Sequence, residues 1–426
     1  MKTRTIILFL SFMALCATLS AQSNLHQYDF SSNKLKRFTA VTSQTNYTTE
    51  KGFGYDLGTN ADMGRDNKPF YFSVKLPEGN YLVTLKLGDV KQATSSTVKA
   101  ESRRLMLEGL KTAPGKYITT SFVVNIKDRL IGGGKEVGLK PRELSKLDWD
   151  DKLTLEFDGH TVIQTLTIAP VKDQVTIYLA GNSTVVNQED EPWASWGQMI
   201  PRFFNPGVAF ANHAESGLTL GSFLGSRRLD KIMSVIKPGD YLFIEFGHND
   251  QKDKGANDGA WKSYTERLKL FVQETRKKGA IPVIVTSTSR RSFGPDGKIV
   301  NSLGDFPAAA RKVAQDEKVA LIDLNLMSAQ LYEALGEEPS KKAFVHYPAN
   351  SYPGQDKPLA DNTHFNPYGA YELAKCIVQG IKDNQLGIQK FIVKGLPVFD
   401  PSQPDAAAEF KWQESPAKVT VKPDGN

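Results

Sequence analysis

The amino-acid sequence predicts a mixed α/β protein in which an all-β sandwich is followed by a parallel sheet covered by helices on both faces. In residues 24–170, short runs of alternating apolar and polar side chains are separated by turn sequences such as Pro-Glu-Gly-Asn and Pro-Gly-Lys, and no convincing helix is visible. From residue 175 to residue 383, short apolar runs alternate with amphipathic helical patterns, which is typical of a parallel sheet.

The first part predicts strands wherever β-branched and aromatic residues alternate with polar ones. Five such runs lie at residues 70–76, 81–87, 117–124, 153–157 and 162–168. Strands at this spacing favour a sandwich of antiparallel sheets. The pattern resembles the galactose-binding-like sandwiches that precede catalytic domains in many polysaccharide-degrading enzymes. That resemblance implies glycan binding, while the alternative, which we prefer, is a structural module that packs on the next domain.

The second part predicts five buried strands, because its apolar runs are short and end at turn residues. They lie at residues 175–180, 208–212, 241–246, 281–286 and 319–323. Helical periodicity predicts helices at 223–236, 261–278 and 367–383, and a further helix is expected to begin within 191–196. Asn366 and Pro367 are suitable cap and first residues for the helix at 367–383.

The first 21 residues have the pattern of a secretory signal peptide, since two basic residues precede the apolar run 6–19 and small residues end it. The run is short for a membrane span, so we expect cleavage, export to the periplasm or beyond, and no membrane insertion. Cys376 would then be the remaining cysteine, which excludes an intrachain disulfide. The predicted divisions are a signal peptide at 1–21, a sandwich at 24–170, a catalytic domain at 174–390 and a tail at 391–426.

Composition excludes some partners. The formal charge of +6 is mild for 426 residues, and no Lys/Arg-rich run with interleaved aromatic residues is present, so nucleic acid is not expected as a partner. The histidines lack the spacing of metal ligands, so neither a metal nor another cofactor is expected. The oligomeric state stays open.

Ser183 is the candidate nucleophile. It lies in the Gly-Asn-Ser-Thr turn that ends the run 175–180, where a strand followed by a helix start would expose its hydroxyl beside free N–H groups. His364 is the candidate base and Asp361 its orienting carboxylate, because residues three apart in a turn lie on one side. The alternatives are an ordinary turn at the serine and an accidental Asp-x-x-His. His248 is a poorer candidate for the base. Glu245 precedes it by three residues in a strand-like segment, where side chains at an odd spacing point to opposite faces.

Three donors could stabilise an oxyanion: the N–H groups of Ser183 and Gly217 and the side-chain amide of Asn249. Taken alone, Gly217 and Asn249 are more simply explained as turn residues. The functional interpretation is favoured because serine, glycine, asparagine and Asp…His occur in this order at successive sheet-edge loops.

This ordered set resembles the four blocks of the SGNH/GDSL hydrolases, and the segments AGNST, AESG, GHND and ADNTH are similar to those of rhamnogalacturonan acetylesterases. The resemblance implies a three-layer α/β/α, flavodoxin-like catalytic domain. It also implies that Ser183 is the nucleophile, His364 the general base and acid, and Asp361 its partner, with the three donors as the oxyanion hole. The family usually has aspartate where this chain has Asn182. This difference should affect the reaction rate more than the assignment to the family.

Residues for substrate binding are harder to predict. Trp193, Trp196 and Tyr347 could stack on sugars, with core packing as the alternative. His213 could line the cleft, and Arg290 could meet uronate carboxylates, although a solvated loop is preferred for Arg290.

The expected function is therefore an exported esterase that removes O-acetyl groups from an acetylated plant cell-wall polysaccharide through an acyl-serine intermediate, with pectic rhamnogalacturonan as the expected substrate. One alternative is an acetylxylan esterase or another acyl esterase of the same fold. Another, from a different class, is a non-catalytic glycan-binding protein.

Overall fold

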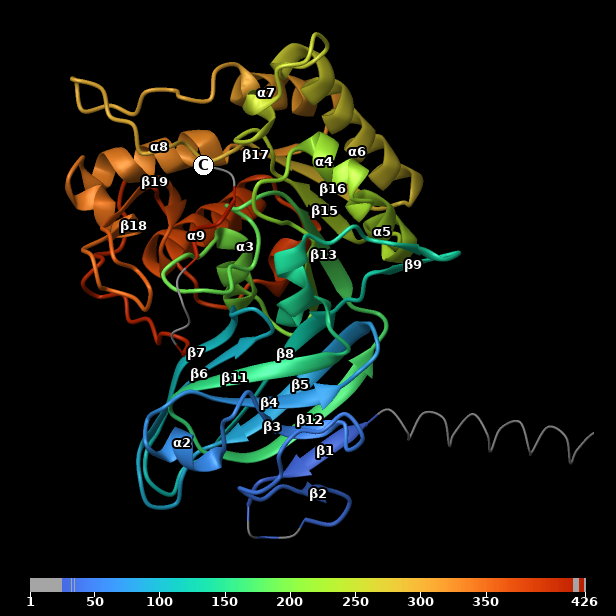
Figure 1. The fold of residues 1–426 in the computed structure, drawn as a ribbon, viewed down its shortest axis with the longest axis vertical. Helices are drawn as coiled ribbons and strands as arrows, with labels where there is room; N and C mark the ends of the chain where they lie inside the picture. The colour runs from blue at the N-terminus through green and yellow to red at the C-terminus, as the bar shows by residue number, and fades with distance from the viewer. Residues whose placement is uncertain (1–24, 32, 34, 417–420, 425–426) are drawn as a thin grey trace, which may run out of the picture.

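The computed structural model describes residues 25–31, 33, 35–416 and 421–424. The predicted signal peptide at 1–21 lies outside the described residues. Within the described ranges, no helix has both the length and the apolar character needed to traverse a bilayer. Figure 1 shows the β-rich first part, in blue through teal to green, against a second part of alternating strands and helices, in green to red. The predicted mixed α/β fold class is confirmed.

The sandwich consists of two five-stranded sheets with strand orders β2-β1-β12-β5-β8 and β3-β4-β11-β6-β7. Inward-facing residues of both sheets, such as Phe72, Leu85 and Leu155, form one apolar core between them. The strands are β1 (His26–Asp29), β2 (Thr39–Ala40), β3 (Phe53–Asp56), β4 (Phe70–Lys75), β5 (Gly79–Leu87), β6 (Thr94–Ala100), β7 (Arg104–Thr112), β8 (Ile118–Ile126), β11 (Lys152–His160) and β12 (Ile163–Val171).

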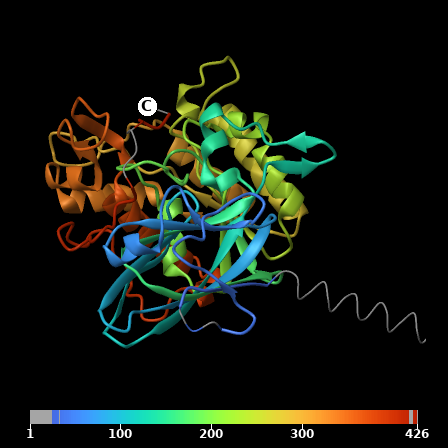
Figure 2. The ribbon, with the colours of Figure 1, turned by 60° about the horizontal axis from the view of Figure 1, so that its bottom comes forward.

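The expectation that this part contains no helix is wrong. It has the short helix α2 (Ala61–Arg65) and two single-turn helices, η1 (Pro141–Ser145) and η2 (Leu147–Trp149). Proline at the first position of η1 needs no N–H partner, and the backbone N–H of Lys140 donates to Glu143 Oε2 at 2.8 Å. The hairpin β9 (Leu130–Gly132) and β10 (Lys135–Glu136) precedes them and projects beside the helices of the second part (Figures 1 and 2).

The second part has one parallel sheet with the strand order β14-β13-β15-β16-β17. The chain leaves β13 toward β14 and returns to β15 on the other side, so a crevice is expected where the carboxyl ends of β13 and β15 diverge. The strands are β13 (Val175–Ala180), β14 (Val208–Asn212), β15 (Tyr241–Ile244), β16 (Ile281–Val285) and β17 (Ala320–Ile322).

Helices cover both faces of this sheet, which gives the predicted three layers. Helices α3 (Trp196–Met199), α8 (Leu324–Leu335) and α9 (Pro367–Asp383) pack on one face. The other face is covered by α4 (Leu220–Gly225), α5 (Arg228–Val235), α6 (Thr265–Lys277) and α7 (Phe306–Glu317). Short turns of helix connect them: η3 (Ile200–Phe203), η4 (Asp250–Lys252), η5 (Ala260–Tyr264), η6 (Pro339–Ala343) and η7 (Gly387–Phe391).

Two predicted helices differ in the structure. The helix expected at 223–236 is divided into α4 and α5, because Gly225 weakens the helix and Arg227 takes a left-handed conformation with φ of 59°. The helix expected at 261–278 becomes a regular α-helix only as α6 from Thr265, because Lys262 in η5 has non-helical φ and ψ angles. The helix expected to begin within 191–196 starts inside that range, at Trp196, after Ser195 in extended conformation. The predicted helix at 367–383 is confirmed, with Asn366 Oδ1 accepting the Gly369 N–H.

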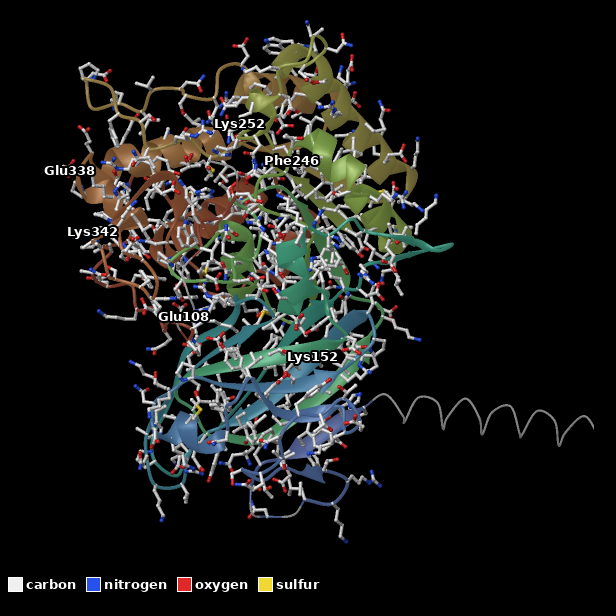
Figure 3. The ribbon with its side chains drawn as sticks, viewed as in Figure 1. Glu108, Lys152, Phe246, Lys252, Glu338 and Lys342 are labelled. Atoms are coloured by element: carbon white, nitrogen blue, oxygen red, sulfur yellow. The ribbon has the colours of Figure 1, made fainter. Side chains whose placement is uncertain are left out.

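The two parts are joined by charged side chains. Arg228 of α5 pairs with Glu143 of η1 at 2.6 Å, and both side chains are fully buried. Lys231, one turn further along α5, lies 2.7 Å from Glu78 of the sandwich. Glu108 of β7, labelled in Figure 3, accepts hydrogen bonds from Arg202 and Tyr371 of the second part, each at 2.9 Å.

Candidate active site

The candidate nucleophile Ser183 lies in a tight turn directly after β13. The N–H groups of Val185 and Val186 both donate to Asn182 O at 3.0 Å. A Cβ on Gly181 would lie 2.5 Å from Val185 Cγ2, so the turn requires glycine there. Asn182 Oδ1 accepts from the N–H and hydroxyl of Thr184, a role that aspartate could also fill. The helix expected to follow this turn begins at Trp196, within the predicted range 191–196.

His364 lies in a bulge, not in the loop that the sequence suggested. Strand β19 (Leu359–Phe365) pairs with β18 (Phe344–Tyr347), but Asp361 opposes Val345 while Phe365 opposes Phe344. Residues 362–364 are therefore extra in the ladder, which turns the backbone locally. This turn lets Asp361 Oδ1 accept the N–H groups of Thr363 at 2.8 Å and His364 at 3.0 Å.

The bulge brings three side chains together across 181 residues of sequence. His364 Nδ1 lies 2.8 Å from Asp361 Oδ2, and His364 Nε2 lies 2.8 Å from Ser183 Oγ. The carboxylate favours a proton on Nδ1, which leaves Nε2 to accept the Ser183 hydroxyl proton. This is the geometry of a hydroxyl activated by an oriented imidazole.

Asp361 is ionised in this arrangement. Burial raises the pKa of its carboxyl, but the hydrogen bond and charge of His364 and the two backbone N–H groups outweigh burial and hold the pKa below its usual value. His248 differs, because burial together with nearby Arg290 and His364 lowers its pKa well below the usual value. His248 is therefore neutral, and His364 alone of the two contacts Ser183.

Three donors lie at the turns beside Ser183. The N–H groups of Ser183 and Gly217 have no acceptor among the residues that the structure describes. Gly217 has φ of 78°, a conformation that favours glycine. Asn249 Nδ2 donates to Leu218 O at 3.2 Å, next to Gly217, which uses one of its two amide hydrogens. This arrangement can present N–H groups to an oxyanion.

A buried carboxylate supports the nucleophile turn from behind, which the sequence did not reveal. Glu245 accepts the Thr184 hydroxyl at 2.7 Å and the Trp196 indole N–H at 2.5 Å. Burial raises the pKa of Glu245 to about 7. Trp196 is fully buried, so the expectation that it stacks on a sugar is wrong, because its ring is part of this support.

The structure separates the other residues suggested for substrate binding. His213 is buried against Trp149 and Tyr178, and burial lowers its pKa well below the usual value, so the expectation that it lines a cleft is wrong. Arg290 Nε donates to Thr363 Oγ1 at 3.2 Å, within the bulge that carries His364. Tyr347 lines a separate cavity of about 370 Å³.

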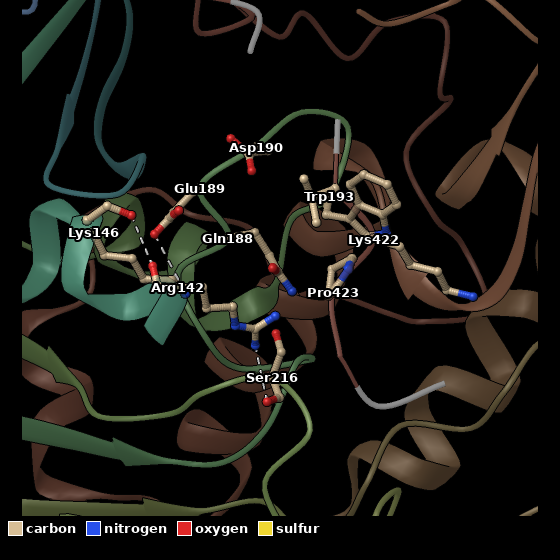
Figure 4. A pocket seen from close by; sticks show the side chains of 11 residues that line it. Arg142, Lys146, Gln188, Glu189, Asp190, Trp193, Ser216, Lys422 and Pro423 are labelled. Atoms are coloured by element: carbon tan, nitrogen blue, oxygen red, sulfur yellow. Dashed lines mark hydrogen bonds and ion pairs between the residues drawn. The ribbon is translucent and has the colours of Figure 1, made fainter. Parts of the chain in front are cut away.

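Trp193 is almost fully buried but lines a cavity of about 210 Å³ next to the catalytic turns (Figure 4). Its other walls come from the sandwich part, the loop after Ser183, the Gly217 turn and a segment near residue 422. They are Arg142, Ser145, Lys146, Gln188, Glu189, Asp190, Ser216, Val421, Lys422 and Pro423. The basic residues of this cavity were missed, because nothing near them in sequence points to the site. The described residues contain no group of three His, Cys, Asp or Glu side chains that could hold a metal ion.

Comparisons with known proteins agree with this geometry. Residues 179–370 match the GDSL-like lipase/acylhydrolase family. The chain is 40% identical over 225 residues to rhamnogalacturonan acetylesterase RhgT of Bacillus subtilis, which covers 52% of this chain and 96% of that protein. The probable rhamnogalacturonan acetylesterase YesY of the same organism is 33% identical over 221 residues, covering 51% and 97%.

A third relative extends into the sandwich part. The uncharacterized esterase YxiM of Bacillus subtilis is 26% identical over 400 residues, covering 88% of this chain and 95% of that protein. The family match, the identity to RhgT and the parallel sheet with its Ser183–His364 contact all agree. The chain belongs to the GDSL-like lipase/acylhydrolase family and is a carboxylic-ester hydrolase, an acetyl esterase of the SGNH fold.

Proposed function

We propose that this protein is an exported carbohydrate esterase that removes O-acetyl groups from pectic rhamnogalacturonan through an acyl-serine intermediate. The observation that carries the catalytic part is the continuous contact from Asp361 through His364 to Ser183 Oγ, with both hydrogen-bond distances at 2.8 Å. The names of RhgT and YesY support the substrate, and the pattern of residues 1–21 supports export.

In the first half of the reaction, Ser183 Oγ attacks the acetyl carbonyl while His364 Nε2 takes its proton. Asp361, which stays ionised, stabilises the imidazolium that forms. The N–H groups of Ser183 and Gly217 and the Asn249 amide receive the oxyanion of the tetrahedral intermediate. Collapse of that intermediate releases the sugar hydroxyl, which takes the proton from His364 and leaves an acetyl ester on Ser183.

In the second half, water replaces the sugar. His364 Nε2 takes a proton from the water as it attacks the acetyl-serine carbonyl, and the same donors receive the second oxyanion. Acetate leaves, and the proton returns from His364 to Ser183 Oγ. The arrangement of Glu245 with Thr184 and Trp196 keeps the turn in place through both halves.

The test is acetate release from acetylated rhamnogalacturonan and acetylated xylan by the wild-type protein and by Ser183→Ala. We expect the higher kcat/KM on rhamnogalacturonan, and loss of acetate release and of labelling by a serine-reactive phosphonate in Ser183→Ala with an unchanged circular dichroism spectrum. Ser43→Ala, in an exposed loop of the sandwich, is the matched control.

Turnover retained by Ser183→Ala would overturn the acyl-serine mechanism. A higher kcat/KM on xylan would overturn the substrate, and a wild-type protein that binds glycan but neither releases acetate nor reacts with the phosphonate would overturn catalysis.

A further inference from the structure

We propose that Lys140 and Arg142, from the sandwich part of the chain, form a subsite for a carboxylate of the substrate beside the oxyanion donors. In this structure the side chain of Asp424 occupies that subsite. The inference rests on the proposed function, since it assigns a residue pair to the recognition of an acetylated uronate. It goes beyond that function because it places part of substrate recognition outside the hydrolase part.

The position of the Asp424 carboxylate defines the subsite. Lys140 Nζ lies 3.0 Å from Asp424 Oδ2 and also donates to Ser216 O at 2.7 Å. Arg142 Nη1 lies 3.5 Å from Asp424 Oδ1. A Cβ added to Gly217 would lie 2.9 Å from Asp424 Cβ, so this side chain rests directly against the glycine of the oxyanion turn. A carboxylate held here is therefore next to an acetyl group held by that turn.

The charges around the cavity leave room for one further anion. Arg142, Lys146 and Lys422 line the cavity, and Lys140 lies beside it against Ser216. Glu215 pairs with Arg142 and, at 2.9 Å, with Lys146. Burial raises the pKa of Glu215, but the two cations outweigh it and lower the pKa to about 2, so Glu215 is ionised. Arg142 and Lys146 therefore share this ionised carboxylate, and Lys140 pairs with Asp424.

Two other acidic residues line the same cavity. Glu189 lies 3.8 Å from Lys146, and burial raises its pKa to about 7, so its charge is only partly present near neutral pH. Asp190 is on the far side of the cavity, away from Arg142 in Figure 4. The positive charge at Lys140 and Arg142 is therefore balanced by Asp424 in this structure.

The cavity connects this pair to the nucleophile. Gln188, on its wall, donates from Nε2 to Ser183 O at 2.9 Å, and Ser216 on the same wall precedes Gly217. Trp193 forms an apolar wall of the cavity, although its side chain is almost fully buried. The segment 421–423 closes the cavity on the other side (Figure 4). A sugar bound here would have its acetyl group at the Gly217 turn and its carboxylate directly beside it, at Lys140 and Arg142.

Asp424 is suited to be displaced. Its side chain is 54% exposed, and that of Lys140 is 29% exposed, so solvent screens this ion pair. A substrate carboxylate that is also held by contacts of its sugar ring would compete with it. Charge-assisted contacts from lysine and arginine favour a carboxylate over an uncharged position of a sugar ring. The subsite therefore distinguishes uronate-containing glycans from neutral ones such as xylan.

The test compares two substrates in Lys140→Met. We expect the ratio of kcat/KM on acetylated rhamnogalacturonan oligosaccharides to kcat/KM on neutral acetylated xylo-oligosaccharides to fall about tenfold, which corresponds to about 1.4 kcal/mol. Lys277→Met is the matched control, because Lys277 forms a solvent-exposed ion pair with Glu274 on the outer side of helix α6. A purely structural role of Lys140 would lower both kcat/KM values together, and an unchanged ratio would overturn the proposal.

A second measurement separates this inference from the proposed function. Unacetylated galacturonate oligomers should inhibit p-nitrophenyl acetate hydrolysis competitively, more weakly in Lys140→Met and more strongly in Asp424→Asn, with Asp424→Glu resembling the wild type. If the wild type releases no acetate from rhamnogalacturonan but shows this inhibition pattern, the carboxylate subsite stands and the proposed substrate fails. If it releases that acetate and neither variant changes inhibition, the subsite fails and the proposed function stands.

Discussion

Asn249→Ala tests the oxyanion hole, because it removes a single donor and leaves the Ser183–His364 contact in place. Two backbone donors, at Ser183 and Gly217, would remain. Loss of one oxyanion donor typically lowers kcat by about 10²–10³, or about 2.7–4 kcal/mol of transition-state stabilisation. The structure adds a second effect, because Asn249 Nδ2 also donates to Leu218 O at 3.2 Å. Its loss should cost about 0.5–1.5 kcal/mol of folding stability.

The assay is steady-state hydrolysis of p-nitrophenyl acetate, with kcat and KM measured separately and stability followed by thermal unfolding. We expect kcat to fall by the full factor with little change in KM, since the interaction forms mainly in the transition state. Asn257→Ala, in an exposed position of the neighbouring loop, is the matched control. An effect confined to KM, or a kcat within a few-fold of wild type, would refute the oxyanion role of Asn249.

Two further substitutions test the carboxylates of the site. Asp361→Asn should lower kcat on the same ester by about 10³–10⁴, because an amide no longer holds the proton on His364 Nδ1. Since the Asp361 pKa is lowered by folding, its contribution to stability is present at neutral pH and is lost as the pH falls below the ordinary value of 3.8, so unfolding curves of variant and wild type should converge in acid. A kcat close to wild type would contradict its role. Glu245→Gln tests the buried support: the pKa of Glu245 rises from 4.5 to about 7 on folding, so the wild type loses stability as the pH rises through that window, and the glutamine variant does not. The melting temperature of the variant relative to the wild type should therefore rise between pH 5 and pH 8, and a constant difference would argue against a protonated Glu245.

The residues at the centre of the site could be predicted because each carries a local signal. Ser183 follows an apolar run and a glycine, and Asp361 precedes His364 by three residues. The contact between them agrees with that pattern, although it arises from a bulge in β19. A bulge depends on the register of the partner strand β18, which the sequence of 359–365 alone does not determine.

Substrate-facing residues could not be separated from core residues in the same way. Trp196 and Trp193 lie three residues apart, yet one supports Glu245 and the other lines a cavity. Lys140 and Arg142 were missed for a different reason. They reach the site from a single-turn helix in the sandwich part, and no periodicity near them points to an active site more than forty residues away.

Strand β6 lies outside the five runs predicted for the sandwich, and this omission has a physical explanation as well. Strand β6 contains Lys99, which hydropathy assigns to a surface, but this lysine is fully buried between Glu156 at 3.1 Å and Asp158 at 3.0 Å. Burial of paired charges breaks the alternation by which sandwich strands are recognised. Prediction was therefore most successful where apolar burial alone shapes an element, as in β13 and α9.

The ion pairs between the two parts limit how the chain can be divided. A hydrolase fragment starting near residue 174 would retain Arg228 and Lys231 but lose Glu143 and Glu78, the carboxylates that neutralise them. The cut would also remove the sandwich surface that covers these two cations, so the fragment would expose both of them and lose the interface contacts of α5. The visible border between sandwich and hydrolase is therefore a poor place to cut this protein, and its halves are best produced and studied together.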